Sequence, residues 1–503
     1  MSTKLQTIHL NDFTGGLDTY NPAAELPINT SPDLDNITVL KNGLKKRQGD
    51  VEFNGTIMSG GGNVQGLGYF KPTSGTEYLV SICGAKTFKS DSLDGTMDDI
   101  TGVTTSTGQD YIWTHSILNN LSIWVGGNRE APIKWNGAGN TAALGGSPNS
   151  GSFGFTTRDR MFIGSTAANP STLCWSILAN PEDWSGTGSG SQTVVTNDGD
   201  ELIGGTPLNN DVTLLFKKYS IHQLITQTAP FPIKPLNIGM GCVGKNALVQ
   251  AKGLVYFVTN EPRMKATDGY QIFDFPNSID DLWDGLTKSR LPYIQGIYYP
   301  VLNQIHWYCS YGSSATANNY CIIWDLNYKC WLRYTTGYDI NVACLASGYR
   351  LMGGHTNGKI YEKDKSATYL DASESNAGVN GYWYASWIRG KSNQSVLHPR
   401  YMDINYEAQS AIGSINYSYG FNYIKDSNAG YFSSITTGSL WGTGVWDTDV
   451  WGTRPDSQKR VFMYGRGNNF QLKLYNSTAN EKLVINSVSI ALQQDETKEI
   501  TNV

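Results

Sequence analysis

The chain has 503 residues, enough for two or three domains that each bury a core of their own without help from metals or disulfides. Only 16% of the residues are charged, whereas 55 glycines, 29 tyrosines and 14 tryptophans are typical of short aromatic-rich strands joined by tight turns, not of a helical bundle. The formal net charge of −5 argues against a surface that neutralises many phosphates, and so against tight nucleic-acid binding.

Signals for targeting, disulfides and metals are sparse. The stretch from Met1 to Phe13 lacks the apolar core of a signal peptide, and no run of about 18 apolar residues predicts a membrane span. We therefore expect synthesis and folding in the cytoplasm. The cysteines are odd in number and lack CxxC or Cys/His zinc spacing, so we expect free, reduced thiols at Cys83, Cys174, Cys242, Cys309, Cys321, Cys330 and Cys344.

Residues 1–59 are predicted to form an N-terminal arm. The arm contains Pro22, Pro27 and Pro32. Because proline fixes φ and removes a backbone donor, the arm suits an extended path across a surface better than a central strand. Within it, SPDLDN from Ser31 to Asn36 predicts the start of a helix. The basic run from Lys41 to Arg47 could pair with acidic patches of another subunit or an adaptor, or it could be a solvated charge cluster.

A pair of short strands recurs between Gly60 and Lys365. Apolar strands of similar character start at Glu77, Leu121, Arg160, Val212, Leu254, Ile305 and Arg350, roughly 39 to 52 residues apart. A second strand follows each of them: AKTFKSD, PIKWNG, TLCWSI, YSIHQLI, GYQIFDF, NYCIIWDL and GKIYEKD. Most are preceded by a further candidate strand, such as GLGYF or IQGIYYP.

Units of this length with three or four antiparallel strands predict an all-β fold, namely a β-propeller of six or seven degenerate blades over residues 60–365. A pair of β-sandwiches is the alternative, because short alternating strands at even spacing suit that architecture as well.

One stretch within the repeats comes close to a phosphate-binding loop. In GMGCVGKN, Gly239, Gly244 and Lys245 match the GxxxxGK core of that motif. However, Asn246 stands where a Ser or Thr hydroxyl must hold magnesium, and the following ALVQAKGLVYFV predicts a strand where the motif needs a helix N-terminus. We therefore predict that this loop binds no nucleotide.

Two acidic turns could in principle donate oxygens to calcium: NDGDE with Asp198, Asp200 and Glu201, and DSLDGTMDD with Asp91, Asp94, Asp98 and Asp99. Neither has alternate-residue ligand spacing, so solvated β-turns are the simpler interpretation. No HExxH or GxSxG motif occurs. The histidines are scattered along the chain, at His9, His115, His222, His306, His355 and His398. We predict no catalytic, cofactor-binding or metal-binding residues and no enzymatic activity.

The composition changes after Lys365. Residues 366–381 are polar and rich in Gly, Ser and Asn, which predicts a linker or long surface loop. Strands with period-two alternation then predict a C-terminal β-sandwich-like domain over residues 382–503. Its tryptophans Trp441, Trp446 and Trp451 are expected to plug the space under a long loop, with a sugar-binding platform as the alternative.

The N-terminal arm carries the most specific pattern in the chain: a Gly-Gly-Leu turn, then SPDL followed by Asn, then a Gly-Leu-x-x-Arg-x-Gly finish. The pattern comprises Gly15, Gly16, Leu17, Ser31, Pro32, Asp33, Leu34, Asn36, Gly43, Leu44, Arg47 and Gly49. It resembles the opening of tail nozzle and tail stabilisation (tail hub) proteins of short-tailed bacteriophages. WSILANPEDW with the later VTLLFKKYSIHQL, and GRGNNFQLKLYN near the C-terminus, are also similar to segments of that family.

The resemblance implies a virion component rather than an enzyme. Family members form a ring, commonly a homohexamer, that extends the portal and adaptor into a channel for DNA ejection and attaches tail fibres or spikes. It implies a location in the virion tail, no cofactor, and passage of DNA without sequence-specific binding. Two alternatives remain, a carbohydrate-active propeller enzyme, whose carboxylates could come from different blades, and a glycan-binding receptor module.

Overall fold

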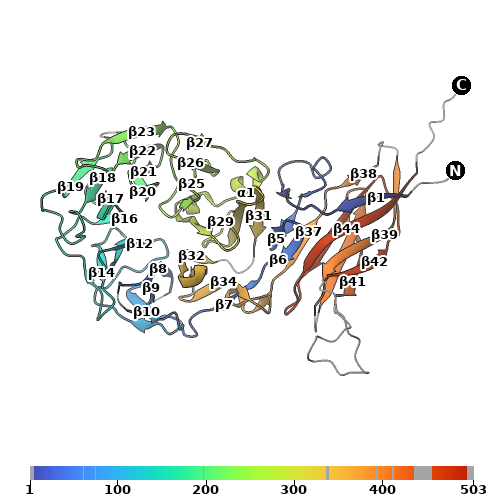
Figure 1. The fold of residues 1–503 in the computed structure, drawn as a ribbon, viewed down its shortest axis with the longest axis horizontal. Helices are drawn as coiled ribbons and strands as arrows, with labels where there is room; N and C mark the ends of the chain where they lie inside the picture. The colour runs from blue at the N-terminus through green and yellow to red at the C-terminus, as the bar shows by residue number, and fades with distance from the viewer. Residues whose placement is uncertain are drawn as a thin grey trace.

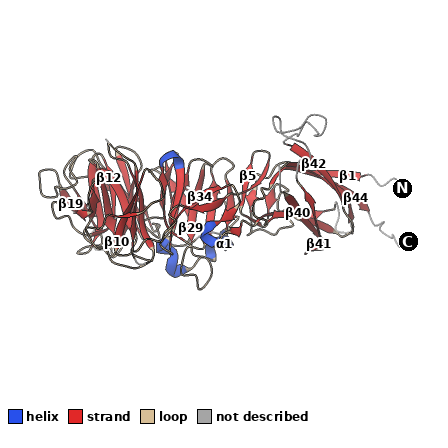
Figure 2. Ribbon diagram, turned by 90° about the horizontal axis from the view of Figure 1, so that it is seen from below, coloured by secondary structure: helices blue, strands red, loops and turns tan. Residues whose placement is uncertain are grey.

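The computed structural model describes residues 5–60, 62–73, 75–195, 198–335, 339–390, 395–409, 413–434 and 456–495. These residues form two bodies that lie side by side, a wide ring of small sheets and a narrower pair of longer sheets (Figure 1). Seen edge-on, the ring is a flat disc (Figure 2). Of the helices in these ranges, none is long and apolar enough to cross a membrane.

The ring is a β-propeller, in which the described residues form seven four-stranded antiparallel sheets. The first three sheets are β8 (Val64–Phe70), β9 (Tyr78–Cys83), β10 (Lys86–Asp91) and β11 (Asp98–Asp99); β12 (Trp113–Leu118), β13 (Leu121–Gly126), β14 (Ile133–Trp135) and β15 (Ala142–Ala143); and β16 (Gly151–Thr157), β17 (Arg160–Thr166), β18 (Thr172–Trp175) and β19 (Gly190–Thr193). The fourth and fifth are β20 (Leu202–Pro207), β21 (Val212–Lys217), β22 (Ser220–Ile225) and β23 (Ile233–Ile238); and β24 (Leu248–Ala251), β25 (Leu254–Val258), β26 (Met264–Thr267) and β27 (Ile272–Phe273). The sixth is β28 (Gln295–Tyr299), β29 (Gln304–Cys309), β30 (Tyr320–Asp325) and β31 (Cys330–Tyr334), and the seventh is β32 (Ile340–Ala346), β33 (Arg350–His355), β34 (Ile360–Ser366) and β7 (Gly49–Glu52).

The first strands of neighbouring sheets contact one another all the way round the axis, including β32 against β8. The ring is closed by β7, which comes from the N-terminal segment and pairs antiparallel with β34. Because the strands of a sheet run alternately up and down, the loop into each first strand and the hairpin between the second and third strands reach the same face of the disc. We call this the entrance face.

The repeated apolar strands of the sequence are the second strands of the seven sheets. The strands predicted to follow them are the third strands of the sheets, with one error. GYQIFDF contains β27, the fourth strand of the fifth sheet, whereas the third strand of that sheet is β26. The short segment Met264–Thr267 has too few apolar residues to show a period.

Helical structure is confined to short turns in the described residues: α1 (Asp280–Asp284), η1 (Lys288–Tyr293), η2 (Ser347–Tyr349) and η3 (Ala372–Glu374). Both α1 and η1 belong to the connection from the fifth to the sixth sheet, and this connection leads into the first strand β28. They therefore lie at the entrance face.

The second body is a β-sandwich of two sheets. One contains β1 (Leu5–Leu10), β5 (Ile37–Leu40), β6 (Gly43–Lys46), β39 (Val396–Glu407), β42 (Asp456–Phe462) and β44 (Val484–Asp495). The other contains β4 (Leu34–Asp35), β37 (Gly381–Tyr384), β38 (Ile388–Arg389), β40 (Ser414–Phe421), β41 (Ile424–Ser433) and β43 (Asn469–Asn476). Alternate residues of β39 are buried, as expected of a strand with one face on a core.

The N-terminal segment is part of both bodies. After the parallel pair β2 (Gly16–Leu17) and β3 (Thr30–Ser31), it supplies β4 to one sandwich sheet, β5 and β6 to the other, and β7 to the propeller. The predicted helix start at Ser31–Asn36 is wrong, because Ser31 ends β3, a bend follows, Leu34 and Asp35 form β4, and Asn36 has a left-handed φ of 54°. The expectation that the arm avoids sheet interiors is also wrong, since β6 lies between β5 and β44; the three prolines end at Pro32, before these strands begin.

The segment predicted as a linker or long surface loop is partly packed at the joint between the two bodies, although Glu374–Ala377 within it are exposed. Residues 366–381 contain β35 (Leu370–Asp371), η3 and β36 (Ala377–Gly378). Asp371 and Val379 are fully buried, and β35 and η3 lie against β7. The connection therefore belongs to the joint between propeller and sandwich.

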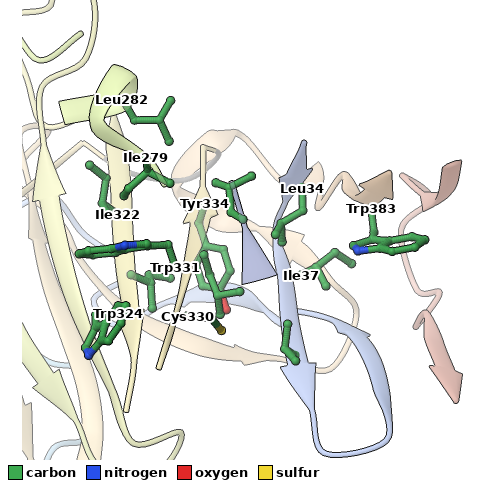
Figure 3. Packing of buried hydrophobic residues seen from close by; sticks show 14 of the residues in the cluster. Leu34, Ile37, Ile279, Leu282, Ile322, Trp324, Cys330, Trp331, Tyr334 and Trp383 are labelled. Carbon is green, nitrogen blue, oxygen red and sulfur yellow. The ribbon is translucent and has the colours of Figure 1, made fainter. Parts of the chain in front are cut away.

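One apolar core runs through this joint. The outer strand β31 of the sixth sheet contributes Tyr334, which faces Leu34 and Ile37 of the N-terminal segment, with Trp383 beyond them (Figure 3). Trp331 of the same strand points to the other side, where its ring packs against Trp283 and Trp324. Because these side chains are buried together, the two bodies share a continuous hydrophobic cluster.

Candidate functional site

The entrance face is hollowed at the propeller axis by a pocket of about 200 Å³, which we call the inner pocket. Loops leading into the first strands of several sheets form its walls. Apolar side chains, among them Ile112 and Leu202, alternate with charged ones. Concave sites in which a few polar groups converge among apolar ones are the usual places for ligand binding in proteins.

Lys245 is the lysine of the stretch that comes close to a phosphate-binding loop. The loop is followed by strand β24, and a Cβ at Gly244 would lie 2.2 Å from the carbonyl oxygen of Pro292, so the phosphate-loop geometry is not formed. Instead Lys245 Nζ donates hydrogen bonds of 2.6 Å to the carbonyl oxygens of Ile112 and Ser152. The side chain thus reaches across the axis from the fifth sheet to the second and third.

The surroundings of Lys245 favour its neutral form. Burial, and to a smaller extent the nearby charge of Arg129, lowers the pKa of Lys245 from its ordinary value to about 7. A lysine in this state is partly charged at neutral pH and can still donate to both carbonyls.

Ion pairs fix the remaining charges of the inner pocket. Arg129 Nη2 lies 3.4 Å from Glu201 Oε2. Asp110 accepts a hydrogen bond from Arg290 of η1, whose guanidinium lies 4.3 Å from the ring centroid of Tyr293. The pair between Asp110 and Arg290 joins η1 to the loop before the second sheet, so η1 partly covers the axis.

A second, wider pocket of about 620 Å³ adjoins the first, and we call it the outer pocket. The two share Val243 and Pro292 as a wall. The outer pocket is lined by Lys218, by Lys288 and by Arg263, which binds Asp280 and Asp284 at 3.0 and 2.9 Å. We call the two pockets together the entrance groove.

The other residues singled out in the sequence lie at the joint between the bodies. We call residues 13–49 the N-terminal clasp. Gly16, with φ 64°, lies so close to β31 that a Cβ would be 2.6 Å from Cys330 Cβ. Gly43 turns the β5–β6 hairpin with φ 153°, and a Cβ there would be 2.3 Å from the carbonyl oxygen of Ile485. Only glycine meets both requirements without displacing a neighbour.

Polar residues of the clasp bind both bodies. Asp33 accepts a hydrogen bond of 2.7 Å from Arg333 Nη2 of the propeller, and the Asn36 N–H donates to the Arg333 carbonyl oxygen at 3.0 Å. On the sandwich side, Ser31 Oγ donates to the Tyr384 carbonyl oxygen at 2.7 Å. Leu17, Leu34 and Leu44 are buried in the shared core.

The last two residues of the basic run, Lys46 and Arg47, are turned inward, whereas Lys41 is exposed and Lys45 half-buried. Arg47 forms a buried ion pair of 2.6 Å with Asp371, and Lys46 Nζ donates to Asn476 Oδ1 at 2.6 Å with its side chain fully buried. Burial lowers the pKa of Lys46 to about 7. Lys46 and Arg47 were predicted either to pair with acidic patches of another subunit or an adaptor or to form a solvated charge cluster. Both predictions are wrong for these two residues.

The acidic turns use their oxygens within the fold. Asp198 pairs with Lys217 at 2.6 Å, and Asp200 accepts backbone N–H groups of Lys218 and Tyr219. In the other turn, ion pairs or hydrogen bonds engage Asp91, Asp94 and Asp99, whereas Asp98 is exposed. The described residues contain no group of three or more His, Cys, Asp and Glu side chains that could hold a metal ion.

The histidines and cysteines are structural where they are buried. Burial lowers the pKa of His115 to about 4 and that of His306 to about 3. Burial also raises the pKa of all seven cysteine thiols, which are free. Trp441, Trp446 and Trp451 lie outside the described residues.

Sequence analysis missed Arg129, Glu201, Lys218 and Lys288 as members of one groove. Glu201 and Lys218 flank strands of the fourth sheet, whereas Arg129 lies in a hairpin of the second sheet and Lys288 in the connection to the sixth, and closure of the ring brings these three loop regions together. Glu201 was noted, but as part of an acidic turn.

Comparisons with known proteins give the fold alone. No protein-family model and no curated protein matches the sequence. Among solved structures, the chain is similar to the WD40 β-propeller domain of Doa1, with 10% identity over 62% of this chain and 97% of that one and a TM-score of 0.40. It is also similar to the β-propeller domain of Cps50 (Swd1) from Myceliophteria thermophila, at 9% identity over 62% and 98% with a TM-score of 0.42, and to YCF48 from Cyanidioschyzon merolae, at 8% over 61% and 96% with 0.39.

Proposed function

We propose that this chain is a structural virion protein that forms the ring-shaped nozzle of a short bacteriophage tail. In this role it extends the channel of portal and adaptor for DNA ejection, attaches tail fibres or spikes, and catalyses no reaction. The observation that supports the proposal most is the place of the motif that resembles tail nozzle proteins. Its residues gather in the N-terminal clasp, where they fix the propeller to the sandwich.

A rigid joint suits this role. A tube assembled from identical subunits keeps its geometry only if each subunit holds its two bodies at a fixed angle. The clasp supplies strands to both bodies, a shared hydrophobic core and a buried ion pair. DNA would pass through the centre of the ring of subunits, because Lys245 and η1 lie across the axis of the propeller itself.

The test is assembly. We expect the purified full chain, alone or mixed with tail-deficient particles, to form closed rings, commonly hexamers, visible by negative-stain electron microscopy and countable by mass photometry. A chain that stays monomeric under both conditions would refute the proposal.

Point variants are better probes of assembly than truncation. Deleting the residues before Asp50 removes β1, β4, β5 and β6 and so takes strands out of both sandwich sheets. We expect that deletion to unfold the sandwich, and a loss of rings would then say nothing about subunit contacts. Rings should instead be measured in charge variants of exposed sandwich residues whose circular dichroism matches that of the wild type.

A further inference from the structure

The entrance groove is more basic than the chain as a whole. Five basic side chains line it, Arg129, Lys218, Lys245, Arg263 and Lys288, against four acidic ones, Asp110, Glu201, Glu261 and Asp284. The whole chain has 38 basic and 43 acidic residues. An excess of positive charge in a concave surface attracts and orients negatively charged ligands.

The acids of the groove are largely neutralised by neighbours. Asp110 binds Arg290, Glu201 lies beside Arg129, and Asp284 binds Arg263. Glu261 is the one groove carboxylate for which the described chain provides no ion pair. The bases Lys218 and Lys288 are exposed, and within the described ranges no carboxylate lies at ion-pair distance from either ammonium group. Lys218 and Lys288 therefore leave the outer pocket with unpaired positive charge, to which Lys245 adds a partial charge at neutral pH in the inner pocket.

The dimensions suit a chain rather than a small ion. The inner pocket, about 200 Å³, is small and lined by both apolar and charged side chains, whereas the outer pocket, about 620 Å³, is larger and lies next to it on the other side of Val243 and Pro292. Their combined size lies in the range of sites that enclose a substantial ligand. A phosphate or acetate ion would occupy the inner pocket alone and would leave Lys218 and Lys288 without a role.

We propose that the entrance groove docks an acidic, extended peptide segment of a partner protein. One carboxylate side chain enters the inner pocket beside Lys245 and Arg129, with its methylene groups against Ile112 and Leu202. The residues that flank it lie in the outer pocket, where their carboxylates pair with Lys218 and Lys288. This inference does not depend on the virion role, because it rests only on the groove.

The probe is a fluorescein-labelled hexaglutamate peptide, titrated with the full chain and followed by fluorescence anisotropy. We expect hexaglutamate to bind and hexaglutamine and hexalysine not to bind, and we expect the affinity to fall as salt is added. Equal binding of hexaglutamine would overturn the proposal, since the groove would then not select for charge.

A charge-reversal pair locates the site. In Lys218→Glu/Lys288→Glu, both side chains are exposed, so the fold should be kept, and we expect hexaglutamate affinity to fall about tenfold or more. The matched control is Lys234→Glu/Lys252→Glu, which changes net charge equally on the outer strand β23 and on a hairpin at the opposite face; we expect less than about a twofold change. Equal losses in the two variants would show a general charge effect and refute the groove.

Two competitors separate other ligands from a peptide. If inorganic phosphate displaced the peptide equally from wild type and from Lys218→Glu/Lys288→Glu, the site would be a small-anion pocket and the proposal would fail. If a twelve-residue oligothymidylate displaced the peptide at lower concentration than unlabelled hexaglutamate does, the groove would be a nucleic-acid surface and the proposal would also fail. Weak displacement by both competitors supports the peptide.

Discussion

At the scale of single residues, the most informative group is Lys245, because its hydrogen bonds span the propeller axis. Its pKa falls from 10.5 in the unfolded chain to about 7 in the fold. Between these values the unfolded state binds more protons than the folded state, so Lys245 makes the free energy of unfolding rise with pH, by at most about 1.4 kcal/mol per pH unit. Lys245→Met keeps the length of the side chain and removes the charge. We expect the free energy of unfolding of the wild type, relative to this variant, to increase from pH 7 to pH 10 in urea denaturation.

The control for this prediction is Lys252→Met, at an exposed turn, which should leave the pH dependence of unfolding unchanged. The lost hydrogen bonds to the carbonyls of Ile112 and Ser152 lower stability at every pH, so the slope, not the offset, is diagnostic. A difference between wild type and Lys245→Met that stays flat from pH 7 to pH 10 would mean that the amine is well solvated.

At the scale of elements, the clasp depends on the ion pair between Arg47, which follows β6, and Asp371 of β35. Arg47 and Asp371 are both buried, so removing either side chain deprives the other buried charge of this ion pair, and we expect Arg47→Met or Asp371→Leu to cost about 3–5 kcal/mol. The double variant should lose much less than the sum of the two, because neither charge of the pair then remains to be compensated. Urea denaturation of all four proteins measures this.

The exposed pair Arg460–Asp403 on the sandwich has good geometry, with both hydrogen bonds at 2.8 Å, and serves as the matched control. Because water screens it, we expect Arg460→Met to have a much smaller effect than Arg47→Met. Equal losses at the two sites would show that the clasp pair is not a special determinant of the joint.

At the scale of the whole molecule, the two bodies should resist separation. The composition of residues 366–381 predicts preferential proteolysis there, but the burial of Tyr369, Asp371 and Val379 predicts that this segment is cut slowly. We expect limited digestion with a protease of broad specificity, followed by mass spectrometry, to give no early cleavage between Ser366 and Gly381. Early cleavage at that place would mean that the packed connection opens easily and that the bodies are joined loosely.

The sequence by itself determined the propeller because the second strands of its sheets are buried on both faces. Strands such as β13 and β29 are almost continuously apolar, so they stand out at regular spacing. Strands without this property were missed or misassigned: β26 is short, and β41 is an exposed edge strand with no apolar alternation.

The sequence also picked out Lys245 and the clasp residues, but not what they do. The role of the clasp follows from pairings such as Leu44 with Ile485 and Val51 with Glu362, which join segments hundreds of residues apart and leave no local periodicity. Docking of the sandwich decides whether Arg47 is exposed to solvent or paired with Asp371. Closure of the ring decides whether Lys245 lies in a pocket next to the one lined by Lys218 and Lys288. Only the tertiary structure decided these contacts, because local sequence sets the character of each strand but not its distant partner.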